Sequence, residues 1–349
     1  MITSVKNFST AGEKLAQVFA RCLKEIKPGK RLMEIDLIDE NIKIKKDNSF
    51  IYFPLKRAVN IENEKTEIVE IECIKLKKHP KSLKESLKDK LSERELKILP
   101  KSFDIIGDIA ILEIPKDLEN KKEIIGNSLI ETFKNIRVVL MKKSKIETEY
   151  RTRGFEIIAG ENRTTTIHRE YGCIYKMDIT STYFSPRLGS ERFRIAEQVK
   201  KRERVLVMFA GIGPYAILIA KYKNPKEIYA IEMNPDAVRY MRENVLINKV
   251  NVNIIEGDVR EETPKLGKFD RIVMPLPKDC GNFLDTALQS LRKKGIIHFY
   301  NFSHNENESI ENVRSITENL GYKIEILNAI KCGSYGPGLY RICVDFRML

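Results

Sequence analysis

The second half of the chain alternates short apolar runs with segments of helical periodicity, and this alternation constrains the fold more than any other feature of the 349 residues. The apolar runs are 205–209, 227–232, 252–256, 271–274 and 295–300, and the helical segments are about 214–223, 235–248, 281–293 and 307–320. Strands that alternate with helices predict βαβ units, a parallel sheet and right-handed crossovers. Two further runs, 322–330 and 340–346, follow without a helix between them, so an antiparallel hairpin is expected to close the sheet.

A glycine-rich turn follows the first of these strands. Gly211 and Gly213 lack a Cβ, so the backbone can approach a ligand there, and Pro214 is suited to start the next helix. Glu232 ends the second strand, where a carboxylate can accept hydrogen bonds from ribose hydroxyls. NAD and S-adenosylmethionine both carry a ribose. The turn by itself is therefore compatible with either cofactor. It is also compatible with a turn that only packs a helix on the sheet and binds no ligand.

Later strand ends discriminate between the two cofactors. Asp258 follows the third strand, where it can accept from an adenine amino group. Pro275-Leu276-Pro277 ends the fourth strand at the carboxyl edge, where open α/β sheets bind ligands. With the terminal hairpin, which is typical of methyltransferases that use S-adenosylmethionine, these features favour that cofactor over NAD. The predicted cofactor-binding residues on the sheet are Phe209, Gly211, Gly213, Glu232, Met233, Asp258, Val259 and Pro275.

The first half of the chain predicts two smaller α+β domains, 1–78 and 79–178, before a Rossmann-like domain at 179–349. The segments of the first are a helical one at about 10–25 and β-like runs at 41–45, 49–55 and 67–76. The segments of the second are strand-like runs at 104–114, 136–141 and 171–178 and a helical one at about 119–134. The expected fold class is therefore α/β, with the parallel sheet in the last domain.

Basic residues concentrate near the first domain boundary. The stretch 75–101 holds ten Lys or Arg against four Asp or Glu. Leu83, Leu87 and Leu91 recur every four residues and would give a helix one apolar face. A solvated helix face and a phosphate-binding surface explain the charge equally well.

Composition narrows the class of protein. The chain carries 62 Lys and Arg against 49 Asp and Glu, a formal net charge of +13, which favours a polyanionic partner, either nucleic acid or an anionic membrane surface. No apolar run approaches the ~20 residues of a membrane span, and the N-terminus has no apolar signal-peptide core. The six cysteines stand singly and only four histidines occur, which favours a cytoplasmic protein with reduced thiols and no metal.

An arginine-rich region with Tyr, Gly and Pro precedes the sheet, a composition typical of sites that bind anions and bases. Two of its segments are GENRT at 160–164 and FSPRLGSER at 184–192. Together with FAGIGP at 209–214, they resemble segments of the archaeal and eukaryotic-type tRNA (guanine-N1) methyltransferases. The resemblance covers about residues 80–349.

The resemblance implies a reaction and four site residues. These enzymes methylate N1 of the guanosine on the 3′ side of the anticodon, position 37 of tRNA, with S-adenosylmethionine as donor and without a metal. The resemblance implies Glu191 as the general base for the N1 proton and Arg151 as the group that stabilises charge on O6. It also implies Tyr183 as a flank of the target pocket and Arg192 as a residue near the cofactor. The protein is expected to be a monomer that binds tRNA and does not bind a membrane.

Two positions depart from the family pattern. Pro275 stands where Asn is usual, and Val207 where an acid is common. They leave open a wyosine-pathway branch that methylates the tricyclic base, or transfers an aminocarboxypropyl group, at the same position. For Glu191, a salt bridge with Arg187 or Arg194 is the alternative to a catalytic role. An NAD-dependent oxidoreductase would leave the basic region unexplained, and a non-catalytic RNA-binding protein would not need acids at the strand ends.

Overall fold

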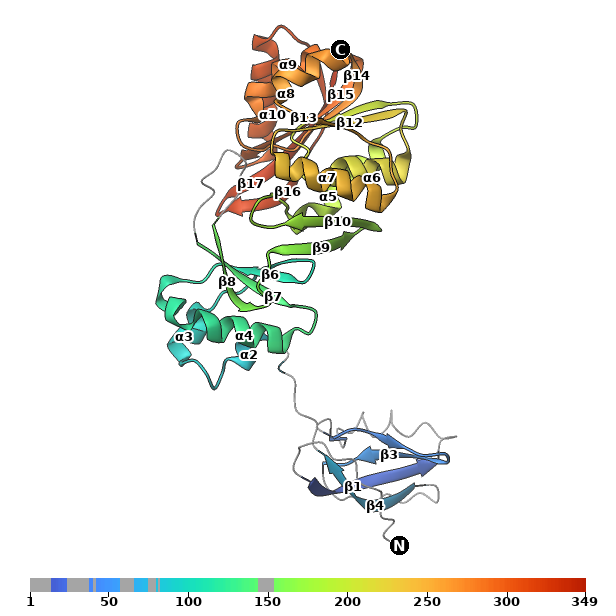
Figure 1. The fold of residues 1–349 in the computed structure, drawn as a ribbon, viewed down its shortest axis with the longest axis vertical. Helices are drawn as coiled ribbons and strands as arrows, with labels where there is room; N and C mark the ends of the chain where they lie inside the picture. The colour runs from blue at the N-terminus through green and yellow to red at the C-terminus, as the bar shows by residue number, and fades with distance from the viewer. Residues whose placement is uncertain are drawn as a thin grey trace. The chain divides into compact units, whose positions relative to one another are not determined.

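A computed structural model describes residues 14–23, 38–39, 42–56, 66–74, 80, 82–143 and 154–349. The chain divides into two compact units, Met1–Lys81 and Ser82–Leu349 (Figure 1). Each unit has hydrophobic clusters of its own. None of the described helices is long and apolar enough to cross a membrane.

The first unit contains an antiparallel sheet. Its strands are β1 (Lys14–Leu23), β2 (Lys45–Lys46), β3 (Phe50–Pro54) and β4 (Thr66–Ile74), in the order β2-β3-β1-β4. The prediction of a helix at about 10–25 is wrong. The described part of this segment is strand β1, which pairs with β3 on one side and β4 on the other. Phe19 and Ala20 are both buried, in two different clusters, so this strand is covered on both faces. Its sequence KLAQVFARCL has polar residues at positions 14, 17 and 21 only, so it lacks the alternation of a half-buried strand.

The second unit begins with a small α+β part. Its elements are α2 (Leu83–Ser86), α3 (Glu93–Ile98), β5 (Asp104–Ile106), β6 (Ile109–Leu112), η1 (Lys116–Lys121), α4 (Lys122–Thr132), β7 (Val138–Lys142) and β8 (Phe155–Gly160), with the sheet order β5-β6-β7-β8. Leu83, Leu87 and Leu91 are buried together, as their spacing predicts, although α2 ends at Ser86. The run 104–114 is two strands rather than one, because Gly107, at φ +61°, turns the chain between β5 and β6.

The main sheet carries the remaining elements. They are η2 (Pro186–Leu188), α5 (Gly189–Gln198), β11 (Arg204–Val207), α6 (Pro214–Lys223), β12 (Glu227–Glu232), α7 (Pro235–Asn248), β13 (Asn253–Glu256), α8 (Val259–Glu262), η3 (Thr263–Leu266), β14 (Phe269–Met274), η4 (Cys280–Phe283), α9 (Leu284–Gln289), β15 (Leu291–Ser303), α10 (Glu306–Asn319), β16 (Ile324–Gly336) and β17 (Leu339–Met348). The helix expected at 281–293 ends early, because β15 already begins at Leu291.

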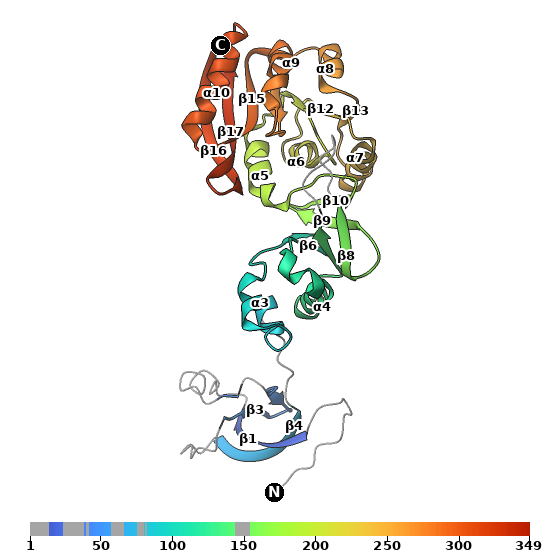
Figure 2. The ribbon, with the colours of Figure 1, turned by 90° about the vertical axis from the view of Figure 1, so that its left-hand side faces the viewer.

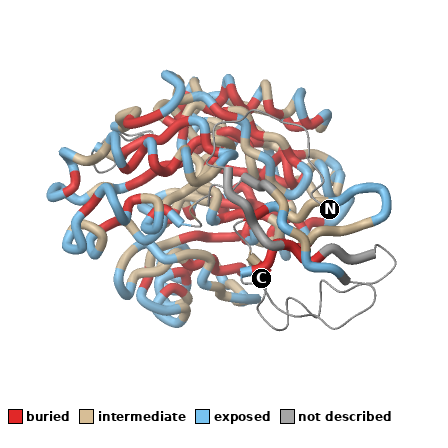
Figure 3. The backbone as a smooth tube through the Cα atoms, turned by 90° about the horizontal axis from the view of Figure 1, so that it is seen from below, coloured by how far each residue is buried: buried red, intermediate tan, exposed pale blue. Residues whose placement is uncertain are grey.

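The order of this sheet is β13-β12-β11-β14-β15-β17-β16. The first five strands are parallel, and β17 runs antiparallel to both β15 and β16. Val205 and Val207 belong to the core cluster that includes α5, α6 and α7, and Leu206 to the cluster that includes α9 and α10. Helices therefore cover both faces (Figure 2). The central strands β11 and β14 are mostly buried, whereas the edge strands β13 and β16 have no buried residue. Figure 3 colours the backbone by burial, with buried stretches in red. The α/β fold with a closing antiparallel hairpin is confirmed.

A two-stranded hairpin, β9 (Thr165–Glu170) and β10 (Cys173–Asp178), packs on α7. Asn244 accepts from the N–H of Lys176 at 2.7 Å and donates to its carbonyl at 3.0 Å. Asn248 does the same for Ile174, at 2.8 and 2.6 Å. Two amides one helical turn apart thus act as a neighbouring strand would and satisfy the backbone of β10.

We expect Asn248→Ala to lower the free energy of unfolding by about 2–4 kcal/mol, because the N–H and C=O of Ile174 both lose their partners. Chemical denaturation followed by circular dichroism measures this loss. Asn282→Ala, at an exposed position, is the control and should stay within about 0.5 kcal/mol of the parent. Equal effects of the two substitutions would contradict the bracing role of Asn248.

Candidate active site

The turn between β11 and α6 is built from residues in the left-handed region. Phe209, Gly211 and Gly213 have φ angles of 54°, 56° and 87°. A Cβ on Gly213 would lie 2.8 Å from Cγ of Met241, so this glycine lets α6 and α7 pack together. Among the described residues, a Cβ on Gly211 would meet only the carbonyl oxygen of Tyr183, at 3.7 Å. The strand end beside Gly211 is therefore open to a ligand.

Glu232, at the end of β12, holds this turn in place. Its Oε2 accepts from the N–H of Gly211 at 2.7 Å, and its Oε1 accepts from Met233 and Asn234 at 3.0 and 2.9 Å. Burial raises the pKa of Glu232, whereas these three N–H groups favour its ionised form. A carboxylate has about four lone-pair sites, so one is left for a ligand hydroxyl. The expected ribose acceptor also shapes the turn.

Asp258 caps α8 and is already engaged. It accepts from the N–H of Arg260 at 2.8 Å, and its carboxylate pairs with the Arg260 guanidinium, which holds the pKa of Asp258 below its usual range. Arg260 also lies 5.3 Å from the ring centre of Phe283, which packs 4.9 Å from Phe209. An adenine bound here would share Asp258 with Arg260. The sequence analysis did not predict this contact of Arg260. The other predicted residues at these strand ends are Met233 after β12, Val259 in α8 and Pro275 after β14.

Glu191 lies in the first turn of α5 and is only 5% exposed. Arg194 donates to both of its oxygens, Nε to Oε2 at 2.7 Å and Nη2 to Oε1 at 2.8 Å. The hydroxyl of Tyr300 on β15 donates to Oε1 at 2.6 Å. Of the two ion pairs offered by the sequence, the one with Arg194 exists, whereas Arg187 pairs with Asp104. An ion pair and a role as a base are compatible, because a carboxylate has a further acceptor site.

Arg192 is almost fully buried, with 2% of its surface exposed. It donates to Glu170 of β9 at 2.9 and 2.6 Å and to the carbonyl of Ser185 at 3.2 and 3.1 Å, and its guanidinium lies 4.8 Å from the ring centre of Phe184. These contacts tie α5 to the hairpin and to the segment before η2. A direct role beside a cofactor stays a prediction. Arg151, the other basic residue expected at the site, lies outside the described residues.

Tyr183 is 39% exposed, and its hydroxyl accepts from Nη2 of Arg341 on β17 at 3.2 Å. Its backbone carbonyl is the atom that faces Gly211. Arg341 lies 5.7 Å from the ring centre of Phe302, which packs 4.1 Å from Tyr335, and Tyr335 is 59% exposed. Exposed aromatic rings beside a guanidinium offer a surface on which a nucleic-acid base can stack. The sequence analysis treated the terminal hairpin only as sheet closure and so missed its side chains.

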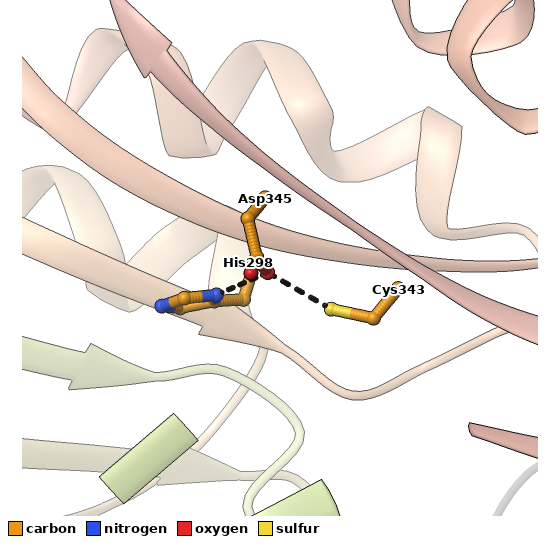
Figure 4. A group of neighbouring side chains, drawn as sticks. All are labelled: His298, Cys343 and Asp345. Carbon is orange, nitrogen blue, oxygen red and sulfur yellow. Dashed lines mark hydrogen bonds and ion pairs between the residues drawn. The ribbon is translucent and has the colours of Figure 1, made fainter. Parts of the chain in front are cut away.

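His298, Cys343 and Asp345 form a buried group on β15 and β17, with ligand-type atoms within 4.8 Å of one another (Figure 4). Such a set could hold a metal ion. Two of its three residues, however, already contact guanidiniums. Arg271 contacts Nε2 of His298 at 2.6 Å, and Arg194 contacts Asp345 at 2.5 Å. Because two guanidiniums at these distances would repel a metal ion, we interpret the group as part of a hydrogen-bonded network.

Comparisons with known proteins place the chain among tRNA-modifying enzymes. The family model of the TRM5/TYW2 methyltransferase domain matches residues 166–325. Models of the TYW2 N-terminal domain and the tRNA methyltransferase 5 N-terminal domain match residues 83–164 and 30–63. The tRNA (guanine(37)-N(1))-methyltransferase Trm5b of Pyrococcus abyssi is 41% identical over 323 residues, which are 91% of this chain and 94% of that enzyme.

Solved structures have the same fold. The complex of aTrm5 and tRNALeu matches with a TM-score of 0.82 and 32% identity, over 95% of this chain and 100% of that one. M. jannaschii TYW2 in complex with AdoMet matches with a TM-score of 0.55 and 31% identity, over 71% of this chain and 99% of that one. One of these proteins therefore holds tRNA and the other the methyl donor predicted from the sequence.

We expect Glu232→Gln to weaken binding of S-adenosylmethionine by about 10- to 100-fold, because an amide NH2 would face backbone N–H groups in place of a carboxylate oxygen. Isothermal titration calorimetry measures the Kd. Asp236→Asn, at a half-exposed carboxylate on α7, is the matched control and should leave the Kd within about twofold. If both variants bind as the parent does, Glu232 does not hold the cofactor.

Proposed function

Because the chain belongs to the TRM5/TYW2 methyltransferase family, we propose that it transfers the methyl group of S-adenosylmethionine to N1 of guanosine 37 in tRNA. The observation that carries this proposal is the 41% identity to the Pyrococcus abyssi enzyme, whose name gives that reaction, over 91% of the chain. The match to a complex with tRNALeu supports tRNA as the partner.

The carboxyl edge of the sheet fits S-adenosylmethionine. The open strand end at Gly211 and the remaining lone pair of Glu232 would take the ribose, while Asp258 and Val259 at the next strand end would take the adenine. Gly213 keeps α6 close behind the turn. When bound, the cofactor supplies a methyl group on a sulfonium, an activated leaving group that needs no metal.

The chemistry at the base needs a proton acceptor. As N1 gains the methyl and the carbon–sulfur bond breaks, the N1 proton has to leave, and we assign it to the carboxylate of Glu191, which Arg194 and Tyr300 hold in one orientation. Negative charge moves to O6 as the proton leaves, and Arg151 is proposed to stabilise it there. Tyr183 would flank the base, since its backbone lies against the glycine-rich turn.

The parts before the sheet are proposed to hold the body of tRNA. We assign residues 1–78 and 79–178 to tRNA recognition and 179–349 to methyl transfer. The division of the chain into compact units at Lys81 supports the first boundary. Because β9 and β10 pack on α7, the hairpin at the end of the second part connects it mechanically to the catalytic part.

We expect the protein to form 1-methylguanosine in an unmodified tRNA transcript with guanosine at position 37, as measured by nucleoside analysis after incubation with labelled S-adenosylmethionine. Glu191→Gln should lower kcat by about 10²- to 10⁴-fold with little change in cofactor affinity. Glu197→Gln, at an exposed position on the same helix, is the control and should keep kcat. Failure of the parent to form 1-methylguanosine would contradict the proposed function. Loss of cofactor binding in Glu191→Gln would assign Glu191 a structural role instead.

A second candidate is modification of the tricyclic wyosine-type base at the same position, by methyl or aminocarboxypropyl transfer. Pro275 favours it, since it presents no side-chain hydrogen-bonding group where the family usually has Asn. Val207 lies in an apolar cluster and adds no polar contact behind the turn. The match of residues 83–164 to the TYW2 N-terminal domain also favours it. Supplying tRNA with the tricyclic base, and cofactor labelled separately in the methyl and aminocarboxypropyl groups, distinguishes these reactions.

Deletion of residues 1–81 should raise KM for tRNA by about tenfold and leave the Kd of S-adenosylmethionine unchanged. The deleted unit has 17 Lys or Arg against 12 Asp or Glu, so 17 − 12 = +5, and its charge would contact phosphates. Steady-state kinetics at several salt concentrations measure KM, and the deletion should make its salt dependence shallower. An unchanged KM and salt dependence would show that this unit does not bind tRNA.

A further inference from the structure

Glu191 is one end of a buried hydrogen-bonded network that spans α5, β14, β15 and β17. Arg194 bridges Glu191 and Asp345. Asp345 contacts Nδ1 of His298 at 2.6 Å, a contact drawn in Figure 4. Nε2 of His298 contacts Nη1 of Arg271 at 2.6 Å, and Arg271 pairs with Glu203 at 2.7 Å. The network therefore consists of Glu191, Arg194, Asp345, His298, Arg271 and Glu203.

The contacts of His298 determine its tautomer. An arginine only donates hydrogen bonds, so Nε2 of His298 has to accept from Arg271, and Nδ1–H has to donate to Asp345. His298 is thus neutral, in agreement with the lowering of its pKa by burial. Burial alone would raise the pKa of Asp345, but hydrogen bonds from His298 and Arg194 hold it well below its usual range, so Asp345 stays ionised.

The charges of this network do not balance. It contains three carboxylates, those of Glu191, Asp345 and Glu203, and two guanidiniums, those of Arg194 and Arg271. With His298 neutral, the sum is 2 − 3 = −1 when all three acids are ionised. Each of the three carboxylates is held by a guanidinium, Glu191 and Asp345 by Arg194 and Glu203 by Arg271.

The other titratable groups near Glu191 do not change this balance. Burial raises the pKa of Tyr300, Tyr215 and Cys343, and it raises the pKa of Cys332 to about 12, so these groups are neutral at ordinary pH. The charged groups nearby are the Arg192–Glu170 pair, which is neutral as a whole, and Arg341, which donates to Tyr183.

We propose that Asp345, acting through Arg194, and Tyr300, acting on Oε1, hold the carboxylate of Glu191 in the orientation from which it takes the proton that leaves N1. This inference rests on the proposed function. Asp345 and Tyr300 are positioning residues, since neither faces the base. Asp345 accepts from Nη1 and Nη2 of Arg194 at 2.5 and 3.3 Å, so the guanidinium that contacts both oxygens of Glu191 is itself anchored to β17. When Glu191 takes the proton, Arg194 is left with one full carboxylate partner, Asp345.

The test is single-turnover methyl transfer to the G37 transcript, with the KM for tRNA and the Kd of S-adenosylmethionine measured on the same variants. Asp345→Asn weakens the anchor of Arg194, and Tyr300→Phe removes the donor to Oε1 of Glu191. Each substitution should lower the rate about tenfold and leave KM and Kd within about twofold of the parent. Asp270→Asn, which breaks an ion pair with Arg292, is the control and should leave the rate unchanged.

A lower rate at unchanged KM and Kd separates positioning from a structural role. Rates that stay at the parent value, or rates that fall together with tRNA or cofactor binding, would overturn the proposal. Tyr300→Phe keeps the ring and so preserves the test if Asp345→Asn fails to fold. A parent protein that methylates G37 while the variants keep the parent rate refutes the network alone. A parent that leaves G37 unmethylated refutes the proposed function, and this inference with it.

Discussion

The buried ion pair between Arg192 and Glu170 is the interaction on which the geometry of the candidate site depends. Arg192 also donates to the carbonyl of Ser185, so one guanidinium joins α5, the β9–β10 hairpin and the segment that carries Tyr183. Gly189 packs directly on Glu170, where a Cβ would lie 2.8 Å from the carboxylate. Loss of one partner would leave a buried charge unpaired, at a cost of about 3–5 kcal/mol. The segment FSPRLGSER therefore holds α5, the hairpin and the segment of Tyr183 together, in addition to contributing residues to the candidate site.

Helix α5 uses neighbouring residues for different tasks. Glu191 and Arg194 are three residues apart, so they share a helix face, and that face meets Tyr300 on β15 and Asp345 on β17. Arg192, between them in sequence, is directed to Glu170 of the hairpin. A ten-residue helix thus connects the candidate base with the main sheet and with the hairpin. A shift of the hairpin would consequently move the carboxylate of Glu191.

The sequence predicts local features well and distant ones poorly. The parallel strands and the glycine-rich turn could be predicted because apolar runs and glycine positions are local signals. Strand β1 could not, since burial on both faces removes its alternation, and β9 could not, since its inward side chains are polar. The partners of Glu191 were predictable only for Arg194, because Tyr300 lies 109 residues away in sequence. Proton-transfer sites depend on such distant contacts, so motifs identify the candidate base without revealing what tunes it.

The basic residues of the chain also divide into those that stabilise the fold through distant contacts and those that are exposed to a partner. Much of the arginine-rich region before the sheet stabilises the fold, because four of its arginines form ion pairs: Arg163, Arg187, Arg192 and Arg194. Arg169, by contrast, is exposed on β9 and lines an open groove of 660 Å³ with Lys176. Residues 84–97 expose four lysines and one arginine: Lys84, Lys88, Lys90, Lys97 and Arg94. Lysines contact phosphates as mobile point charges without a fixed geometry. Binding of a polyanion to these lysines would respond strongly to salt, whereas the buried pair of Arg192 and Glu170 is screened much less.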